Sequence, residues 1–182
     1  MSIASLSTVR AAVVDQGLDP VHVRGIRPAD DAELRRFYAG LSPESRRTRF
    51  LSVSLGLSQA QSSSFCTTDH QHREGFVAVL ERGDQAGIVG HLCLEPDGVD
   101  AAEVAIAVAD RFQRRGVGRR LMTAATAWAR REHVTRLTAT MSGGNAPIQL
   151  LLVELGLPTD VQHVGAGIVQ ITIDMVGQDI AA

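Results

Sequence analysis

The stretch from residue 103 to residue 131 carries the clearest pattern of apolar and polar positions in the chain. Val104, Ile106 and Val108 alternate with alanines, and Glu103 begins the alternation. Because successive side chains of a strand point to opposite faces of its sheet, this run predicts a strand with one bulky apolar face and one small-residue face. Apolar residues then recur at helical spacing from residue 121 to residue 128, which predicts an amphipathic helix. The small-residue face suits either a tightly packed helix or a ligand that lies close to the strand backbone.

The same periodicities divide the rest of the chain into short strands and helices. Turn signals at residues 83–84 and 96–98 separate consecutive apolar runs, which predicts an antiparallel meander leading into the strand at residue 103. Helices are predicted to begin at Asp30, Ser42, Ser58 and Asn145, and further strands to lie over residues 21–26, 75–82, 87–94, 135–141 and 163–175, the last broken near residues 165–167. This order of elements predicts an α/β sandwich with a mixed sheet.

A glycine- and arginine-rich turn, Gln113-Arg-Arg-Gly116-Val-Gly118, joins the predicted strand to the predicted helix. The first N–H groups of a helix lack internal partners, and the helix dipole makes that end partly positive. Glycines remove the side chains that would keep an anion away from those N–H groups, so the turn predicts an anion site. Five arginines lie within the ten residues from Arg111 to Arg120. We therefore expect a ligand that carries several phosphates.

Other phosphate-binding motifs fit this turn less well. All 18 basic residues are arginine, so the chain lacks the lysine that a P-loop NTPase requires. Leu121 stands where a dinucleotide-binding G-x-G-x-x-G motif needs its third glycine. An arginine-rich run also suits nucleic acid, but the net charge is −2 and the other arginines are scattered among acids. We therefore expect no nucleic-acid partner.

Two ordered motifs resemble the acyl-CoA signature of the GNAT N-acetyltransferase superfamily. Gln113-x-x-Gly116-x-Gly118 follows an apolar strand and opens a helix, and the segment from Asn145 to Leu157 is similar to the N-x-P…L-G-F segment of that superfamily. Residues 27–82 look like the bacterial protein-lysine acetyltransferase branch. The resemblance implies the GNAT acyl-CoA N-acyltransferase fold, an α+β sandwich with a mixed, mostly antiparallel sheet of about six to seven strands flanked by helices.

The resemblance also implies that the acyl donor is acetyl-CoA. In GNAT folds the strand before the turn splays from the next strand, and its free backbone groups bind the pantetheine arm. Asn145 is expected to hydrogen-bond the CoA arm, to cap its helix, or to do both. No metal is expected. The residues expected to bind the acyl donor are Ile106, Ala107, Val108, Gln113, Arg114, Arg115, Gly116, Val117, Gly118, Arg119 and Asn145.

Glu103 is the candidate general base. An alkyl amine has a pKa of about 10.4, so it must lose a proton before it can attack a thioester at neutral pH. Glu103 is the only acid on the small-residue face of its strand, and the lysine acetyltransferases that the chain resembles use a glutamate on this strand. The alternative is a solvated glutamate that only orients the substrate. His91, on the neighbouring strand, is a second candidate, although a histidine there is more often a packed residue of the sheet.

The residue that would protonate the leaving thiolate is missing from its usual place. Many GNAT enzymes use a tyrosine seven residues after the motif asparagine, and Leu152 stands at that position. The only tyrosine, Tyr38, is far away in sequence. A CoA thiolate, with a cysteine-like pKa near ~8.5, can leave without such an acid or take its proton from water.

Length and composition set the wider limits. The 182 residues suit one domain, which we place at residues 21–176, with an N-terminal arm over residues 1–20 and a C-terminal tail over residues 177–182. No apolar window is long enough to span a membrane, and the N-terminus lacks the pattern of a secretory signal. Two cysteines without metal-ligand or redox spacing add to an expectation of cytoplasmic residence.

Two smaller features carry weaker expectations. His70 and His72 lie beside Asp69, and this grouping could bind a metal, but no further ligand cluster supports it, so we expect a loop near the acceptor site. Leu150 and Val153 widen the apolar face of the last helix, which would suit a homodimer contact.

Two classes of function remain open. The first is an enzyme that moves an acetyl group from acetyl-CoA to a primary amine, either a protein lysine or a small amine such as a polyamine or an aminoglycoside. The second is a non-catalytic module that binds acyl-CoA. Leu152 permits the second class, and Glu103 argues against it.

Overall fold

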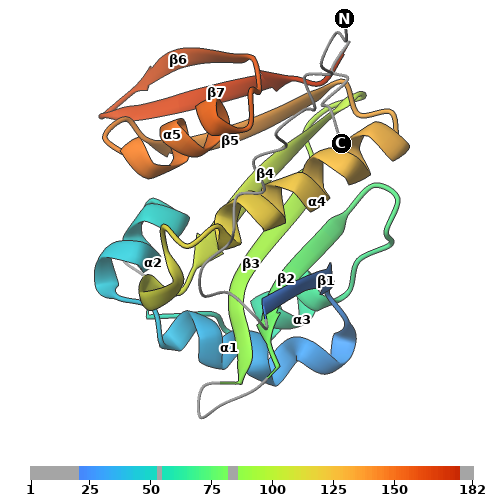
Figure 1. Ribbon diagram of the computed structural model, residues 1–182, viewed down its shortest axis with the longest axis vertical. Coiled ribbons are helices and arrows are strands. Elements are labelled where there is room, and N and C mark those ends of the chain that lie inside the picture. The colour runs from blue at the N-terminus through green and yellow to red at the C-terminus, as the bar shows by residue number, and fades with distance from the viewer. Residues whose placement is uncertain (1–20, 53–54, 82–85, 177–182) are drawn as a thin grey trace, which may run out of the picture.

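The computed structural model describes residues 21–52, 55–81 and 86–176. Within these residues the strands form a seven-stranded sheet of order β1-β2-β3-β4-β5-β7-β6 (Figure 1). All neighbouring pairs are antiparallel except β4 and β5, which are parallel. The strands are β1 (Val21–Gly25), β2 (Glu74–Leu80), β3 (Gly87–Pro96), β4 (Ala101–Val108), β5 (Arg136–Ser142), β6 (Thr159–Gly165) and β7 (Ile168–Asp174). The predicted mixed, mostly antiparallel sheet and its meander are confirmed.

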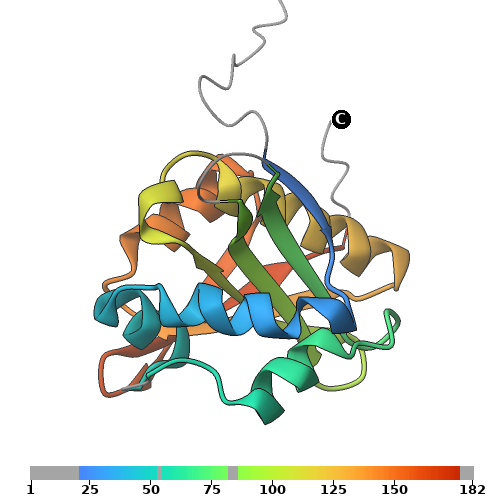
Figure 2. The same ribbon diagram turned by 90° about the horizontal axis from the view of Figure 1, so that it is seen from below.

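Helices cover both faces of the sheet. They are α1 (Asp31–Ala39), α2 (Pro43–Phe50), α3 (Gln59–Cys66), α4 (Val117–Arg131) and α5 (Ala146–Glu154), with the short 3-10 helices η1 (Pro28–Asp30) and η2 (Asp110–Phe112). Seen from below, α1 lies on one side of the strands and α4 on the other (Figure 2). No helix in the described part of the chain is both long and apolar enough to cross a membrane.

The alternation along β3 and β4 produces two separate cores. Leu92, Leu94 and Val104 are buried with Trp128 of α4 on one face. On the other face, Ala107 packs in a second cluster with Tyr38 and other residues of α1. The bulky apolar face predicted for the strand at residue 103 is therefore confirmed, and its small-residue face lies on the side of α1, α2 and α3.

The sheet opens between β4 and β5. Their pairing covers only Ala101–Glu103 against Arg136–Thr138, although β4 continues to Val108 and β5 to Ser142. Figure 1 shows β5 turning away from β4 beyond this point, together with β7 and β6. Backbone groups on this side of residues 104–108 consequently have no strand partner, as the GNAT resemblance implied.

Local signals placed most helix starts correctly. The Ser42 side chain accepts a hydrogen bond from Ser45 N–H at the start of α2, and Ser58 and Gln61 form a complete capping box at the start of α3. Asn145 occupies the N-cap position of α5, but its side chain makes no capping hydrogen bond, so its predicted capping role is wrong.

The C-terminal strands begin earlier than predicted. Residues 159–165 form the exposed edge strand β6, which turns through residues 165–167 into β7. The prediction missed most of β6 because its sequence is largely polar. A strand that is exposed along its whole length needs no alternation of apolar residues.

We expect Gly90→Ala to destabilise the fold, because α4 packs directly onto this glycine. A Cβ atom there would lie 3.0 Å from a Leu121 methyl and 3.1 Å from a Val117 methyl. Such overpacking should lower the free energy of unfolding by about 1–3 kcal/mol, measured by urea denaturation. Gly144→Ala is the control, since a Cβ at Gly144 meets nothing within 4 Å. Equal stability of the two variants would contradict this account of the packing.

Candidate functional site

The predicted anion site lies at the N-terminus of α4. Gly116 is the N-cap, with a left-handed φ of 82°, and Arg114 also has a positive φ of 57°. The first helical bond runs from Arg120 N–H to the Gly116 carbonyl, which leaves the N–H groups of residues 117–119 without helical acceptors. Three donors and the positive end of a helix dipole therefore meet at one exposed turn, which suits a phosphate.

The arginines of this turn divide into two groups. Arg114, Arg115 and Arg119 are exposed, and they supply positive charge around the helix end. Arg120 instead donates from Nη1 to the Val21 carbonyl at 2.6 Å. Of the five arginines counted in this run, Arg120 is thus held by β1 and not by the turn.

Polar contacts join the anion site to α2. Asp110 accepts hydrogen bonds from Ser42 N–H at 2.9 Å and from the Ser42 and Ser45 hydroxyls at 2.7 Å each. Burial acts to raise the pKa of Asp110, but these hydrogen bonds outweigh burial and lower it. Gln113 donates from Nε2 to Ser45 Oγ at 3.0 Å and to the Val108 carbonyl at 3.1 Å. The first turn of α2 is thus fixed to the phosphate turn.

The predicted pantetheine-binding residues lie where β4 has lost its partner. Ile106, Ala107 and Val108 follow the last β4–β5 pair, Glu103 with Thr138. A Cβ at Gly118 would lie 3.8 Å from the Ile106 side chain and 3.4 Å from Leu151 of α5. The glycine therefore keeps open the space between the free edge of β4 and the anion site.

Glu103 is exposed and lies at the point where β4 and β5 part. Directly opposite, on β3, is Glu95. Arg73 holds Glu95 through Nε and Nη2, at 2.6 and 2.8 Å. In the described part of the chain, Glu103 itself accepts no hydrogen bond and forms no ion pair. Its carboxylate is therefore exposed and unpaired within these residues.

A second charged group, Arg49 of α2, lies on the same sheet face. Its Nη2 donates to Cys93 Sγ at 3.2 Å, and Cys93 is the β3 partner of Ala105. Burial opposes the charge of Arg49, but Tyr38, Cys93 and Glu103 together raise its pKa. Sequence reasoning missed Arg49, since nothing in the run Arg46-Arg-Thr-Arg49 distinguishes it from the other two arginines.

His91 is a packed residue of the sheet. It is fully buried, and its Nδ1 lies 2.9 Å from the Tyr38 hydroxyl. Burial, with a smaller effect of Arg49, lowers the pKa of His91 to about 3, and burial raises the pKa of Tyr38 to about 12. The ring is therefore neutral, its Nδ1 shares a hydrogen bond with the Tyr38 hydroxyl, and it is a poor proton acceptor for a substrate.

The remaining predicted positions are also placed. Asn145 is half-buried at the start of α5, and its side chain is free of a capping bond. Leu152 is buried in the core beside α4, so the position of the usual tyrosine points inward. Asp69 accepts hydrogen bonds from three backbone N–H groups of its own loop, and the described residues contain no group of three or more side chains suited to hold a metal.

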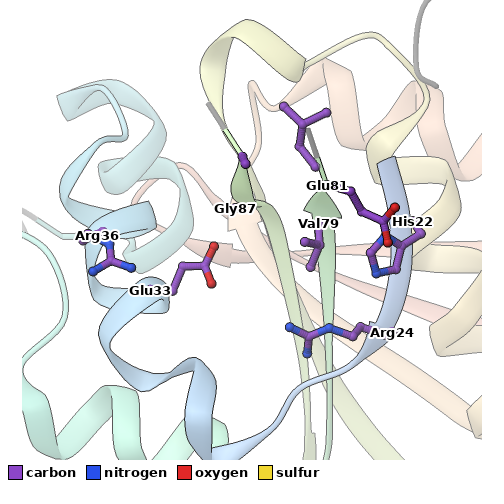
Figure 3. A pocket seen from close by; sticks show the side chains of 9 residues that line it. His22, Arg24, Glu33, Arg36, Val79, Glu81 and Gly87 are labelled. Carbon is purple, nitrogen blue, oxygen red and sulfur yellow. The ribbon is translucent and has the colours of Figure 1, made fainter. Parts of the chain in front are cut away.

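A recess elsewhere on the surface lies apart from these groups. It is lined by His22 and Arg24 of β1, Glu33 and Arg36 of α1, and residues at the end of the β2–β3 hairpin (Figure 3). Neither Glu103 nor any residue of the anion site lines it. Its position at the β1 side of the sheet separates it from the β4–β5 opening.

Comparison with known structures places this geometry in a family. The chain is 26% identical to the GNAT domain of S. lividans PAT, with a TM-score of 0.75 over 85% of this chain and 90% of that chain. It is 21% identical to an acetyltransferase of the GNAT family from Streptococcus pneumoniae (TM-score 0.68; 85% and 98% covered). It is 16% identical to yncA from Salmonella typhimurium, solved with its cofactor acetyl-CoA (TM-score 0.67; 89% and 96% covered).

The similarities to the Streptococcus pneumoniae and Salmonella typhimurium structures show that the chain shares their fold. The family model for the acetyltransferase (GNAT) family matches residues 34–156, which include Glu103, the phosphate turn and all of α5. A free carboxylate and an open strand edge on β4, followed in the chain by the N-terminus of α4, agree with that match. The chain therefore belongs to the GNAT acetyltransferase family and is an acyl-CoA N-acyltransferase.

Proposed function

We propose that this enzyme transfers an acetyl group from acetyl-CoA directly to a primary amine, with Glu103 as general base. The observation that carries the proposal is the unpaired carboxylate of Glu103 at the point where β4 and β5 part. The free edge of β4 runs from this point toward the N-terminus of α4. One extended donor would thus reach from the anion site to the base.

The phosphates of acetyl-CoA would bind the N–H groups of residues 117–119, with Arg114, Arg115 and Arg119 adding positive charge. The pantetheine arm would lie along Ile106, Ala107 and Val108, and the amide of Asn145 is available to it. Charge-assisted hydrogen bonds of this kind are among the stronger polar contacts in proteins.

Glu103 takes a proton from the ammonium group of the acceptor, directly or through water. The amine nitrogen then attacks the thioester carbonyl and forms a C–N bond. Backbone N–H groups of β4 stabilise the negative charge that develops on the carbonyl oxygen. When the C–S bond breaks, CoA leaves as a thiolate and takes its proton from water or from the reacting nitrogen, since Leu152 carries no acidic hydrogen.

Two acceptor classes have support. The 26% identity to the GNAT domain of S. lividans PAT, together with the lysine-acetyltransferase resemblance of residues 27–82, favours a protein lysine. The exposed acidic side chains of Asp97, which follows β3, and of Glu103, near the start of β4, favour a small amine. A non-catalytic acyl-CoA-binding role is the remaining alternative.

Three further expectations from the sequence remain proposals. We propose residues 21–176 as the catalytic domain and the cytoplasm as its location. Leu150 and Val153 of α5 are exposed, at 59% and 72%, which supports a homodimer contact through α5. A monomeric mass at micromolar concentration would contradict that contact.

Release of the CoA thiol tests the proposed function. Acetyl-CoA would be incubated with lysine-containing peptides, polyamines, aminoglycosides and free amino acids in separate reactions. We expect acceptor-dependent release with at least one class, and acetylation of its amine by mass spectrometry. Tight acetyl-CoA binding without release for any class would favour the binding-module alternative.

A further inference from the structure

A guanidinium without a carboxylate partner shares the sheet face of Glu103. Arg49 contacts Cys93 through Nη2, and the rings of Phe50 and Phe65 lie 5.1 and 5.8 Å from its Cζ. Its Nε is buried and has no hydrogen-bond partner. Among the residues that the structure describes, no carboxylate forms an ion pair with Arg49.

The groups in contact with Arg49 supply no negative charge. Burial raises the pKa of the Cys93 thiol and raises the pKa of Tyr38 to about 12, so both side chains are neutral at physiological pH. Arg49 is half-buried, and a partly desolvated charge without a counter-charge is unfavourable. This arrangement indicates that an anionic group from outside the chain completes the surroundings of Arg49.

The strand register gives the distance between Arg49 and Glu103 along the sheet. Glu95 pairs with Glu103, and the next pair on this face is Cys93 with Ala105. Residues two apart on one strand are separated by about 7 Å. Arg49 lies on the Cys93 pair, so it is about one such step from Glu103. The methyl side chain of Ala105 leaves the space between them open on β4.

Of the two opposed acids, Glu95 has an ion-pair partner and Glu103 has none among the described residues. Arg73 neutralises Glu95 through two hydrogen bonds. Glu103 and Arg49 form no ion pair with each other, although Glu103 is the only carboxylate that contributes to the raised pKa of Arg49. The carboxylate of Glu103 and the guanidinium of Arg49 thus lie about one step apart on the same face of β3 and β4. A small molecule could bridge them.

We propose that the acceptor is a free amino acid, whose amine meets Glu103 and whose carboxylate meets Arg49. This inference rests on the proposed function, because it takes Glu103 as the site of the amine. A zwitterion supplies both missing charges at a separation of a few bonds. A polyamine would bring a second positive charge toward Arg49, and an ordinary lysine peptide would leave Arg49 without an anion.

The test compares acceptors that differ only in the carboxylate. Each L-amino acid and its α-carboxamide would be assayed for CoA release with saturating acetyl-CoA. We expect kcat/KM for the best amino acid to exceed that of its amide by about 10–10²-fold, the effect of one charge-assisted contact. Amidation lowers the pKa of the adjacent amine, which favours the amide, so a preference for the acid is a stringent result.

Arg49→Met should bring the acid-to-amide ratio close to one, and Arg49→Lys should restore part of it. Arg47→Met is the matched control on α2, because Arg47 is exposed, and it should keep the ratio of the wild type. Acetyl-CoA titration would verify that each variant is folded.

The outcomes separate this inference from the proposed function. Equal use of acids and amides by the wild type, or turnover only with polyamines or lysine peptides, overturns the amino-acid acceptor and leaves the acetyltransferase. Equal losses for acid and amide in Arg49→Met also overturn it, and assign Arg49 to the positioning of Glu103. No release with any acceptor overturns both.

Discussion

Glu103→Gln lowers kcat/KM for the amine acceptor by on the order of 10²–10⁴-fold, the usual contribution of a general base. The amide of glutamine keeps the size and polarity of the side chain but accepts no proton at neutral pH. Because the phosphate turn lies at the other end of β4, acetyl-CoA affinity should stay unchanged. Steady-state CoA release and calorimetric titration of acetyl-CoA measure the two quantities.

Glu95→Gln provides the matched comparison on the neighbouring strand. Glu95 stands directly opposite Glu103 but is already bound by Arg73, so we expect a much smaller loss of kcat/KM. If Glu103→Gln kept the kcat/KM of the wild type, the acetyltransferase activity would remain supported, but Glu103 would not be the general base. Equal losses in both variants would point to a shared electrostatic effect instead.

Gly116→Val weakens acetyl-CoA binding by about 10²-fold, the second large effect. Gly116 has a φ of 82°, a conformation that a β-branched residue adopts only with strain. The branched side chain would also stand beside the N–H groups that receive the phosphates. A loss of roughly 2–3 kcal/mol of binding free energy corresponds to this change in Kd, measured by titration of acetyl-CoA.

Gly98→Val separates a binding defect from a folding defect. Gly98 has a φ of 99° and nothing within 4 Å of an added Cβ, so it carries similar strain in a turn between β3 and β4. We expect this variant to lose stability but to keep its acetyl-CoA affinity. Unchanged affinity in Gly116→Val would remove the α4 N-terminus from the phosphate site.

Local patterns were sufficient for the donor side of the site. The alternation around Val104 and the glycines of the turn lie within one continuous stretch, so strand, turn and helix follow from side-chain spacing. The opening of the sheet beside Ile106 is different, because no residue of β4 encodes it. It was expected only from the family resemblance, and the register of β4 with β5 now shows it.

The acceptor side depends on contacts between distant parts of the chain. Arg49 reaches Cys93 across 44 positions, and Arg73 reaches Glu95 across 22. Which arginine of α2 turns inward depends on the strand it meets, and that information is absent from the helix itself. Arg120 shows the same limit, since its contact with Val21 lies 99 positions away.

The short pairing of β4 with β5 has a consequence for stability. Three pairs of residues connect β1–β4 to the strands β5, β7 and β6, and beyond them β4 has no strand partner on that side among the described residues. An arm of pantetheine along that edge would act as a partial strand between the two halves. A donor at a hundred times its Kd stabilises a protein by about 2.7 kcal/mol. Bound acetyl-CoA would then complete the hydrogen bonding of the β4 edge. The concentration of acetyl-CoA in the cell would set the fraction of the enzyme that stays folded under heat and resists proteolysis.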